Sequence, residues 1–345
     1  MEKLRIGIVG LNFGRHIVRE LTEGNGAEHM EVAAVCDLDA EKAHAIGDPL
    51  GVQVYTDLAD LLADETIPTV GLYTGPNGRA GLLRTIIGAG KDVMTTKPFE
   101  RDIDAALAVL HEAKSAGRVL HLNSPAPVLP PDLAQIAAWR DEYDLGQAVG
   151  CRLDTWVRYN QEADGSWQDD PDQCPVAPIF RIGIYLINDV VRFLGEPEAV
   201  QVMHSRIFTG KPTPDNGQLS IRFRNGALAN IYASFCCEDG DHYANAMTLN
   251  FDRGTVWRNI GPRDGWRDKE VRLALQQSRG EGERPQVVEA RVGGGTSGLY
   301  QWDNFCRAVR GETLPDETTP EQVAAGLRII EAMRRAETSG RTEPV

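Results

Sequence analysis

The chain has 345 residues, 42% of them hydrophobic, and a formal net charge of −14 at pH 7. This length predicts about two domains of ~100–200 residues each, with enough apolar residues for substantial cores. The negative charge disfavours nucleic acid, whose phosphates require a basic protein surface. No stretch approaches the ~20 apolar residues of a membrane span, and the first residues run straight into an expected strand without room for a signal peptide. Six scattered cysteines lack metal-site spacing, so we expect a cytoplasmic protein without a bound metal.

Short apolar runs alternate with segments of helical periodicity over residues 5–124. The runs are rich in β-branched residues and apolar throughout, which is typical of parallel strands covered on both faces. This alternation predicts an N-terminal Rossmann domain, an α/β fold with a doubly wound parallel sheet. The expected strands are 6–10, 32–37, 70–74, 93–96 and 119–123, and the expected helices are 13–21, 39–46, 57–62, 79–88 and 104–116.

A different pattern follows the prolines near residue 125. Residues 219–223 and 247–251 alternate apolar and polar side chains, which indicates antiparallel strands with one polar face. Helices are expected over 183–194 and from Thr319, where a capping box opens the last helix. The second domain is therefore expected to be α+β with a large, mostly antiparallel open sheet. The expected division is 1–124 and 125–345, and packing of the C-terminal helix 320–338 back on the first domain is left open.

A strand, a tight turn and a helix are expected over residues 5–14. Gly10 ends the strand and Gly14 opens the helix, whereas Asn12 and Arg15 stand where the G-x-G-x-x-G pattern has glycines. Asparagine is among the residues that best tolerate positive φ, so the turn stays feasible. Backbone amides and the positive end of the helix dipole favour a pyrophosphate at such a turn. The expected nucleotide contacts here are Gly10, Leu11, Asn12, Phe13 and Gly14.

Asp37 ends the second expected strand. A carboxylate there accepts hydrogen bonds from the ribose hydroxyls of NAD and repels the 2′-phosphate of NADP. Leu38, the next residue, offers no cation for such a phosphate, so both positions favour NAD over NADP. An alternative role for Asp37 is to cap the following helix, and the two roles are compatible.

Several segments resemble one family. Residues 90–99 (GKDVMTTKPF) resemble the GK-hydrophobic-EKP segment of the glucose–fructose oxidoreductase / inositol dehydrogenase / rhizopine catabolism (Gfo/Idh/MocA) family. Residues 75–77 match its TPN element, 195–197 its LLGEP, and 305–311 with the last helix its C-terminal pattern. The resemblance covers essentially the whole chain in order. It implies further cofactor contacts at Thr74, Gly75, Pro76, Asn77, Thr96 and Lys97.

The resemblance also implies catalytic positions. The family counterpart of Lys97 lies beside the nicotinamide and helps to polarise or deprotonate the reacting carbinol, and the Lys97-Pro98 bond is a candidate cis peptide. Counted from Trp167, the family's Asp and His fall on Arg181 and Tyr185. Some family members carry Tyr at the His position, and cations at Lys97 and Arg181 would stabilise a phenolate. Arg181 either tunes Tyr185 or binds an anionic substrate group.

Departures from the family pattern predict a reshaped substrate pocket. Thr96 replaces a Glu, Ala80 replaces a His, and residues 175–178 (PVAP) replace a glycine triplet, which stiffens that loop. The candidate substrate contacts are Arg158, Trp167, Asn188 and Asp189, with Trp156 and Tyr159 as further candidates for the pocket wall.

The function implied is an NAD-dependent oxidoreductase of sugars, polyols or related small molecules. Hydride would pass between a hydroxyl or keto carbon and the nicotinamide while Tyr185, assisted by Lys97, exchanges the hydroxyl proton. Two alternatives stay open: a lyase or glycosidase-like enzyme that uses NAD transiently, and a non-catalytic NAD-binding homologue. The family also packs subunits through the open sheet, which implies a homodimer or homotetramer.

Overall fold

The computed structural model describes residues 2–240, 243–262, 270–294, 297–315 and 318–345. It separates into two compact units, of which the first comprises Met1–Val128 with Leu299–Pro320 and the second Leu129–Gly298 with Glu321–Val345. This division differs from the predicted boundary at residue 124. The returning segment joins the first unit because Trp302, Phe305 and Cys306 are buried in its core, so the boundary depends on contacts that local sequence patterns do not reveal.

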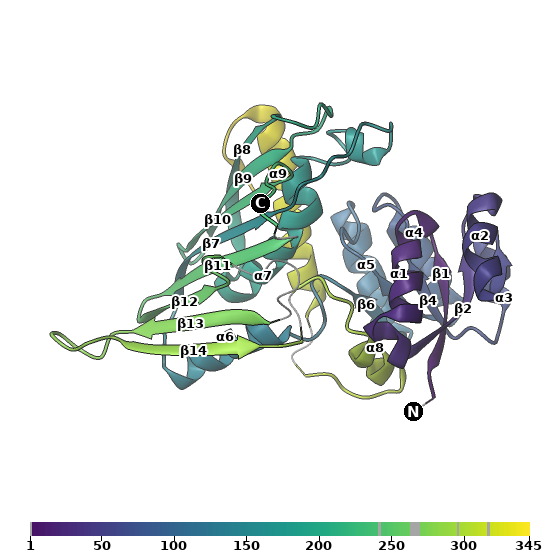
Figure 1. The fold of residues 1–345 in the computed structure, drawn as a ribbon, viewed down its shortest axis with the longest axis horizontal. Helices are drawn as coiled ribbons and strands as arrows, with labels where there is room; N and C mark the ends of the chain where they lie inside the picture. The colour runs from purple at the N-terminus through teal and green to yellow at the C-terminus, as the bar shows by residue number, and fades with distance from the viewer. Residues whose placement is uncertain (1, 241–242, 263–269, 295–296, 316–317) are drawn as a thin grey trace. The chain divides into compact units, whose positions relative to one another are not determined.

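The first unit contains a parallel sheet, which confirms the Rossmann prediction. In the described residues six strands are ordered β3-β2-β1-β4-β5-β6, all paired in parallel (Figure 1). The short strand β3 had no expected counterpart in the sequence. The strands are β1 (Leu4–Val9), β2 (Met30–Cys36), β3 (Gln53–Tyr55), β4 (Thr69–Leu72), β5 (Asp92–Thr95) and β6 (Leu120–Leu122).

Helices cover both faces of this sheet. Leu61 of α3 lies against Gly7 in β1, whereas the neighbouring Ile8 lies against Gly14 of α1. Because successive strand residues point to opposite faces, α1 and α3 flank the sheet on opposite sides. The helices are α1 (Leu11–Glu23), α2 (Ala40–Gly47), α3 (Leu58–Ala63), α4 (Arg79–Gly88), α5 (Ile103–Ser115) and α8 (Trp302–Val309).

The second unit is α+β with a large open sheet, as predicted. Nine strands of the described chain are ordered β14-β13-β12-β11-β7-β10-β9-β8-β15, antiparallel except for the parallel pair β10–β7. The strands are β7 (Ala148–Trp156), β8 (Pro197–Ser205), β9 (Asn216–Phe223), β10 (Leu228–Ser234), β11 (Ala244–Phe251), β12 (Gly254–Arg258), β13 (Val271–Gln277), β14 (Gln286–Val292) and β15 (Glu343–Pro344).

Three helices pack on one face of this sheet (Figure 1). They are α6 (Pro131–Glu142), α7 (Ile184–Leu194) and α9 (Pro320–Ser339), and their apolar side chains join the inward side chains of the strands in one core. From Glu321 onward, α9 therefore belongs to the second unit, and its apolar stripe includes Ile329 and Met333. This stripe is buried against the second sheet.

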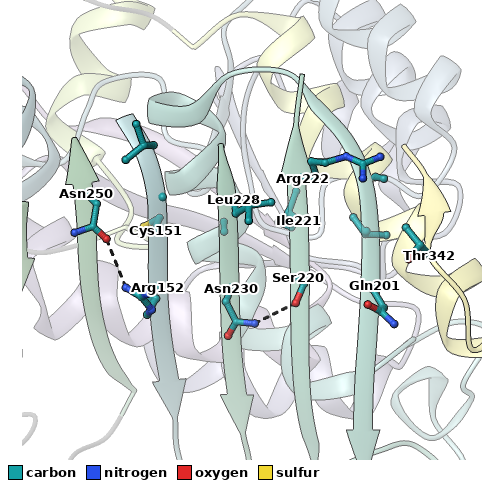
Figure 2. Close-up of a pocket in the computed structure, with 15 residues that line it drawn as sticks. Cys151, Arg152, Gln201, Ser220, Ile221, Arg222, Leu228, Asn230, Asn250 and Thr342 are labelled. Carbon is teal, nitrogen blue, oxygen red and sulfur yellow. Dashed lines mark hydrogen bonds between the residues drawn. The ribbon is translucent and has the colours of Figure 1, made fainter. Parts of the chain in front are cut away.

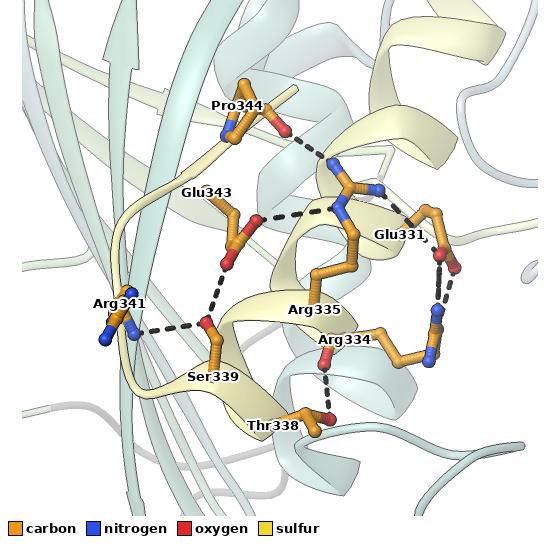
Figure 3. Close-up of polar contacts among 8 residues, drawn as sticks. All are labelled: Glu331, Arg334, Arg335, Thr338, Ser339, Arg341, Glu343 and Pro344. Carbon is orange, nitrogen blue, oxygen red and sulfur yellow. Dashed lines mark hydrogen bonds and ion pairs between the residues drawn. The ribbon is translucent and has the colours of Figure 1, made fainter.

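Polar contacts fix the end of the chain to α9 (Figure 3). Ser339 Oγ donates a hydrogen bond of 2.7 Å to Glu343, and Arg335 donates one of 2.5 Å to the Pro344 carbonyl. These contacts hold β15 against β8 at the edge of the sheet. No helix among the described residues is long and apolar enough to cross a membrane.

Candidate functional site

The turn between β1 and α1 depends on Gly10. Its φ is +85°, in the left-handed region that L side chains rarely adopt, and it stands immediately before α1. A Cβ at this position would lie 3.0 Å from the backbone of Tyr73 and Thr74 after β4. Gly10 therefore lets two neighbouring strand ends approach closely, at the edge of a parallel sheet where nucleotides bind.

Helix α1 begins at Leu11, earlier than the sequence indicated. Asn12 and Phe13 lie in its first turn and are exposed, and Gly14 is buried one residue further on. The expectation that Asn12 adopts positive φ is wrong, because Gly10 alone makes the turn and Asn12 is helical. The missing middle glycine therefore leaves the N-terminus of α1 intact, and the first turn of a helix is where a pyrophosphate is favoured.

Asp37 follows β2 and contacts this turn. Its Oδ2 accepts a hydrogen bond of 2.7 Å from the Leu11 amide, and its Oδ1 accepts one of 3.0 Å from the Asp39 amide. The suggestion that Asp37 caps the next helix is wrong, since Asp39 is the N-cap of α2 and accepts from the Lys42 amide. Leu38 is 92% exposed. The Asp37 carboxylate and the turn at Gly10 are thus joined by a direct hydrogen bond.

Lys42 is a residue near this carboxylate that the sequence argument overlooked. Its Nζ lies 3.6 Å from Asp37 Oδ1 and 3.5 Å from Asp39 Oδ2. Lys42 is five residues beyond Asp37 in the sequence, and the first turn of α2 brings its ammonium back to the Asp37 carboxylate. Two carboxylates and one ammonium leave one net negative charge beside the expected ribose position.

The loops after β4 and β5 hold the remaining expected cofactor contacts of the first unit. Adjacent parallel strands β4 and β5 bring Thr74 and Thr96 to the same edge of the sheet. The Lys97 amide donates a hydrogen bond of 3.0 Å to Asn123 Oδ1, and Lys97-Pro98 is a cis peptide, as anticipated. The residues gathered at these two loops are Thr74, Gly75, Pro76, Asn77, Thr96 and Lys97.

In the second unit, Arg181 lies in a π-helical turn, Ile179–Gly183, that runs directly into α7. Its guanidinium lies 4.8 Å from the Tyr159 ring centroid and 5.0 Å from that of Phe235, and it donates a hydrogen bond of 3.0 Å to Gln161. The regular α-helix that the sequence predicted from residue 183 is thus preceded by a wider turn. Cation–π contacts on two rings hold the guanidinium in a defined position.

Tyr185 lies one turn after Arg181, at the start of α7. Burial and the neighbouring Tyr243 raise the pKa of Tyr159, and the positive charge of Arg181 opposes this rise. Arg181 and Tyr185 are four residues apart, on the two sides of the junction between the π-helical turn and α7. The chain crosses the Tyr185 ring at Gly298, where φ is +101° and a Cβ would lie 2.5 Å from Cε1.

The candidate substrate residues differ in their surroundings. Trp167 packs edge-on against Phe180, with ring centroids 6.2 Å apart, next to the π-helical turn. Arg158 is exposed, and its guanidinium lies 5.3 Å from the Phe208 ring centroid. Asn188 is buried on α7, facing Gly326 of α9.

The position of Asp189 argues against substrate contact. It is buried, its Oδ2 lies 3.2 Å from Arg258, and its Oδ1 accepts a hydrogen bond from Ser297. Arg258 also lies 3.0 Å from Asp132. The sequence did not reveal this network, because its members come from α6, α7 and β12. It indicates a structural role for Asp189.

Comparison with known families agrees with this arrangement. Residues 4–124 match the family described as "Oxidoreductase family, NAD-binding Rossmann fold", and residues 133–257 match the "GFO/IDH/MocA C-terminal domain". The chain belongs to the Gfo/Idh/MocA family of oxidoreductases. The resemblance seen in the sequence is therefore confirmed, and so are the Rossmann fold and the oxidoreductase class.

Individual members of the Gfo/Idh/MocA family show how far the similarity extends. The chain is 27% identical over 289 residues to D-xylose 1-dehydrogenase (NADP(+)) 2 of Haloferax volcanii, covering 76% of this chain and 85% of the relative. It is 26% identical to D-apiose dehydrogenase of Paraburkholderia graminis, covering 68% and 61%. The crystal structure of aldose-aldose oxidoreductase from Caulobacter crescentus complexed with glycerol superposes with a TM-score of 0.75 at 20% identity, covering all of both chains.

Proposed function

We propose that this family member is an NAD-dependent dehydrogenase or reductase of the CH–OH group of a sugar, polyol or related small molecule. The observation that supports this most directly is the pair formed by Asp37 and the Gly10 turn. A carboxylate suited to a ribose is bonded to the first amide of the helix whose N-terminus suits a pyrophosphate. Relatives named for xylose and apiose, and a structural neighbour bound to glycerol, support a polyhydroxylated substrate.

The residue roles follow the chemistry of the reaction. When bound, NAD accepts hydride at the nicotinamide, or NADH donates it. Tyr185 exchanges the proton of the substrate hydroxyl, and the ammonium of Lys97 polarises the same oxygen. Arg181, positioned by two aromatic rings, stabilises a phenolate at Tyr185 or binds an anionic substrate group. Trp167, Arg158 and Asn188 remain the proposed substrate contacts.

We propose NAD rather than NADP as the preferred cofactor. The local net charge from Asp37, Asp39 and Lys42 is negative and disfavours the 2′-phosphate. The named specificity of the Haloferax relative for NADP makes a direct comparison of both cofactors informative.

A screen of sugars, polyols and sugar acids with NAD and NADP, followed at 340 nm, tests the reaction. We expect NADH to accumulate with at least one substrate, and Tyr185→Phe and Lys97→Ala to lose most of kcat while still binding NAD. Tyr143→Phe, which removes a phenol hydroxyl at the C-terminal end of α6, is the matched control and should keep activity. Substrate consumption without NADH accumulation would instead indicate transient oxidation. NAD binding without turnover of any compound would indicate a non-catalytic homologue.

We also propose a homodimer or homotetramer through the open face of the second sheet. Figure 2 shows a hollow on this face that crosses β11, β7, β10, β9 and β8. Val149 and Leu228 line it on the adjacent strands β7 and β10 and are 47% and 59% exposed, and neighbouring exposed apolar side chains favour a protein contact. Light scattering after size exclusion should give a multiple of the chain mass, and Leu228→Asp should lower that mass. A monomeric wild type would contradict the proposal.

The compartment that we propose is the cytoplasm. All six cysteines are free thiols in the structure, which fits a reducing environment. Cell fractionation with an antibody would test this assignment.

A further inference from the structure

Arg79, the first residue of α4, has an unusual environment for an arginine. Its side chain is 1% exposed. Its Nη1 donates hydrogen bonds to the carbonyls of Thr96 (2.5 Å), Pro98 and Phe99 (3.2 Å). Its Nη2 donates one to the carbonyl of Thr74. A single buried guanidinium therefore connects the loop after β4 with the loop after β5, on both sides of Lys97.

Glu100 makes the complementary contact in the opposite direction. It is 3% exposed, and its Oε2 accepts a hydrogen bond of 2.8 Å from the amide of Ala80 in the first turn of α4. Its Oε1 accepts from the amides of Arg101 (2.6 Å) and Asp102 (3.2 Å). The arginine thus reaches from helix to loop and the glutamate from loop to helix. We call these two residues the Arg79–Glu100 clasp.

Stability alone does not account for the Arg79–Glu100 clasp. Burying a charge is costly unless it is fully compensated, and apolar residues of similar size are often as stable. Backbone carbonyls accept hydrogen bonds from both terminal nitrogens of Arg79, whereas its Nε is buried without a hydrogen-bond partner among the described residues. Burial lowers the pKa of Arg79 to about 10, which still leaves it charged at neutral pH. This charge holds peptide carbonyls in place with a geometry that only a planar, many-donor group provides.

We propose that Arg79 is a positioning residue that fixes the peptide of residues 96–99, and with it Lys97, and that Glu100 completes this function. The proposal rests on the role of Lys97 in the proposed function. The Lys97 amide, bonded to Asn123, lies between carbonyls that Arg79 holds. Loss of the guanidinium therefore releases the lysine backbone on both sides.

The first test measures the loop without any substrate. Hydrogen exchange is compared in wild type, Arg79→Met, Arg79→Lys and Glu100→Gln. We expect peptides covering 96–102 to exchange at least tenfold faster in Arg79→Met, with β2 unchanged as an internal reference. The matched control is Arg84→Met, which removes an exposed arginine of the same helix that pairs with Glu112. Equal exchange in wild type and Arg79→Met, or a uniform increase that includes β2, would overturn the proposal.

The second test separates positioning from stability. The variants are assayed at a temperature well below their own thermal midpoints, so that all of them are folded. Arg79→Met should then lower kcat by about 10²-fold, because a small misplacement of a reacting group has an effect of this size. Arg84→Met should leave kcat unchanged. Arg79→Lys should recover only part of kcat, because an ammonium cannot reach four carbonyls. Should Arg79→Met be unstable, Arg79→Ala assayed with millimolar guanidinium provides a rescue test, with urea as the uncharged control.

The outcomes distinguish the two proposals. A folded Arg79→Met enzyme with unchanged kcat, or an Arg79→Ala enzyme that guanidinium does not rescue, refutes the positioning role and leaves the proposed function intact. Failure of the wild type to turn over any substrate refutes the proposed function. The hydrogen-exchange result then still decides whether Arg79 holds the loop.

Discussion

The choice between NAD and NADP can be tested at one carboxylate. Asp37→Asn removes the charge that should repel a 2′-phosphate and keeps a side-chain oxygen that accepts the Leu11 amide. The turn at Gly10 should therefore survive the substitution. The charge beside the ribose position changes from one net negative to zero, because Lys42 and Asp39 remain as a pair.

Two effects of similar size add in the cofactor ratio. Removing a carboxylate about 5 Å from a phosphate of charge about −2 relieves roughly 1.7 kcal/mol of repulsion at a dielectric constant of about 80. Replacing a charged acceptor by a neutral one weakens the hydrogen bond from the 2′-hydroxyl, which only NAD has, by about 1 kcal/mol. The bond from the 3′-hydroxyl is common to both cofactors and cancels in the ratio. The preference should therefore shift towards NADP by about 2.7 kcal/mol, which is a factor of roughly 10².

The assay is kcat/KM for each cofactor at saturating substrate, supported by calorimetric dissociation constants for NAD and NADP. The double variant Asp37→Asn/Lys42→Ala is the decisive control. Loss of the Lys42 ammonium restores one net negative charge beside the ribose position, and it should remove most of the increase in kcat/KM for NADP. High salt should also weaken the repulsion between the Asp37 carboxylate and the 2′-phosphate of NADP, because charges near the protein surface are screened by salt. Equal use of NAD and NADP by the wild type, or no change in the ratio in Asp37→Asn, would refute the assignment of Asp37 to the ribose.

Three further predictions concern stability and binding. Gly10→Ala should lower the affinity for NAD and destabilise the fold by at least about 1–2 kcal/mol, because alanine is strained in the left-handed region and its Cβ would contact the backbone of Thr74. Unchanged NAD binding in calorimetry would contradict the role of the turn. Arg258→Met leaves two buried carboxylates without their shared cation, and should cost about 3–5 kcal/mol in urea unfolding. Arg140→Met, which removes an exposed arginine of α6 that pairs with Asp141, should cost about 0–1 kcal/mol. Burial lowers the pKa of His121 in the folded protein to about 3. Between pH 6.5 and 3 the unfolded chain therefore binds a proton at His121 that the folded protein does not, and the free energy of unfolding falls as the pH drops through this range. His121→Leu should flatten the pH dependence of the thermal midpoint over the same range.

Local sequence patterns were sufficient for most of the first unit. The parallel sheet, the helices between its strands and the Gly10 turn follow from periodicity, β-branched runs and one glycine, because a covered parallel strand must be apolar on both sides. Helix α4 was placed at the same residues, 79–88, that the structure shows. Strand β3 was missed because a half-buried strand of three residues has too short a pattern to recognise.

The candidate site was predictable where a motif is contiguous and incomplete where contacts come from distant segments. Asp37, Lys97 and Tyr185 are candidates that position and family resemblance predict, and they stay predictions. Lys42 and the Arg79–Glu100 clasp were not predicted, since their partners are backbone groups or side chains that no spacing rule identifies.

Periodicity and motifs in the sequence were enough to predict a Rossmann domain, a second domain with an antiparallel sheet, and a tight turn at Gly10 before the first helix. The surroundings of the buried charges and the packing of the last helix became visible only in the folded chain. Asp189 pairs with a buried arginine, Arg79 donates hydrogen bonds to carbonyls of the loop that contains Lys97, and α9 belongs to the second unit from Glu321 onward. The physical reason is that burial and hydrogen-bond partners are properties of the folded chain, since they arise between residues that are far apart in sequence.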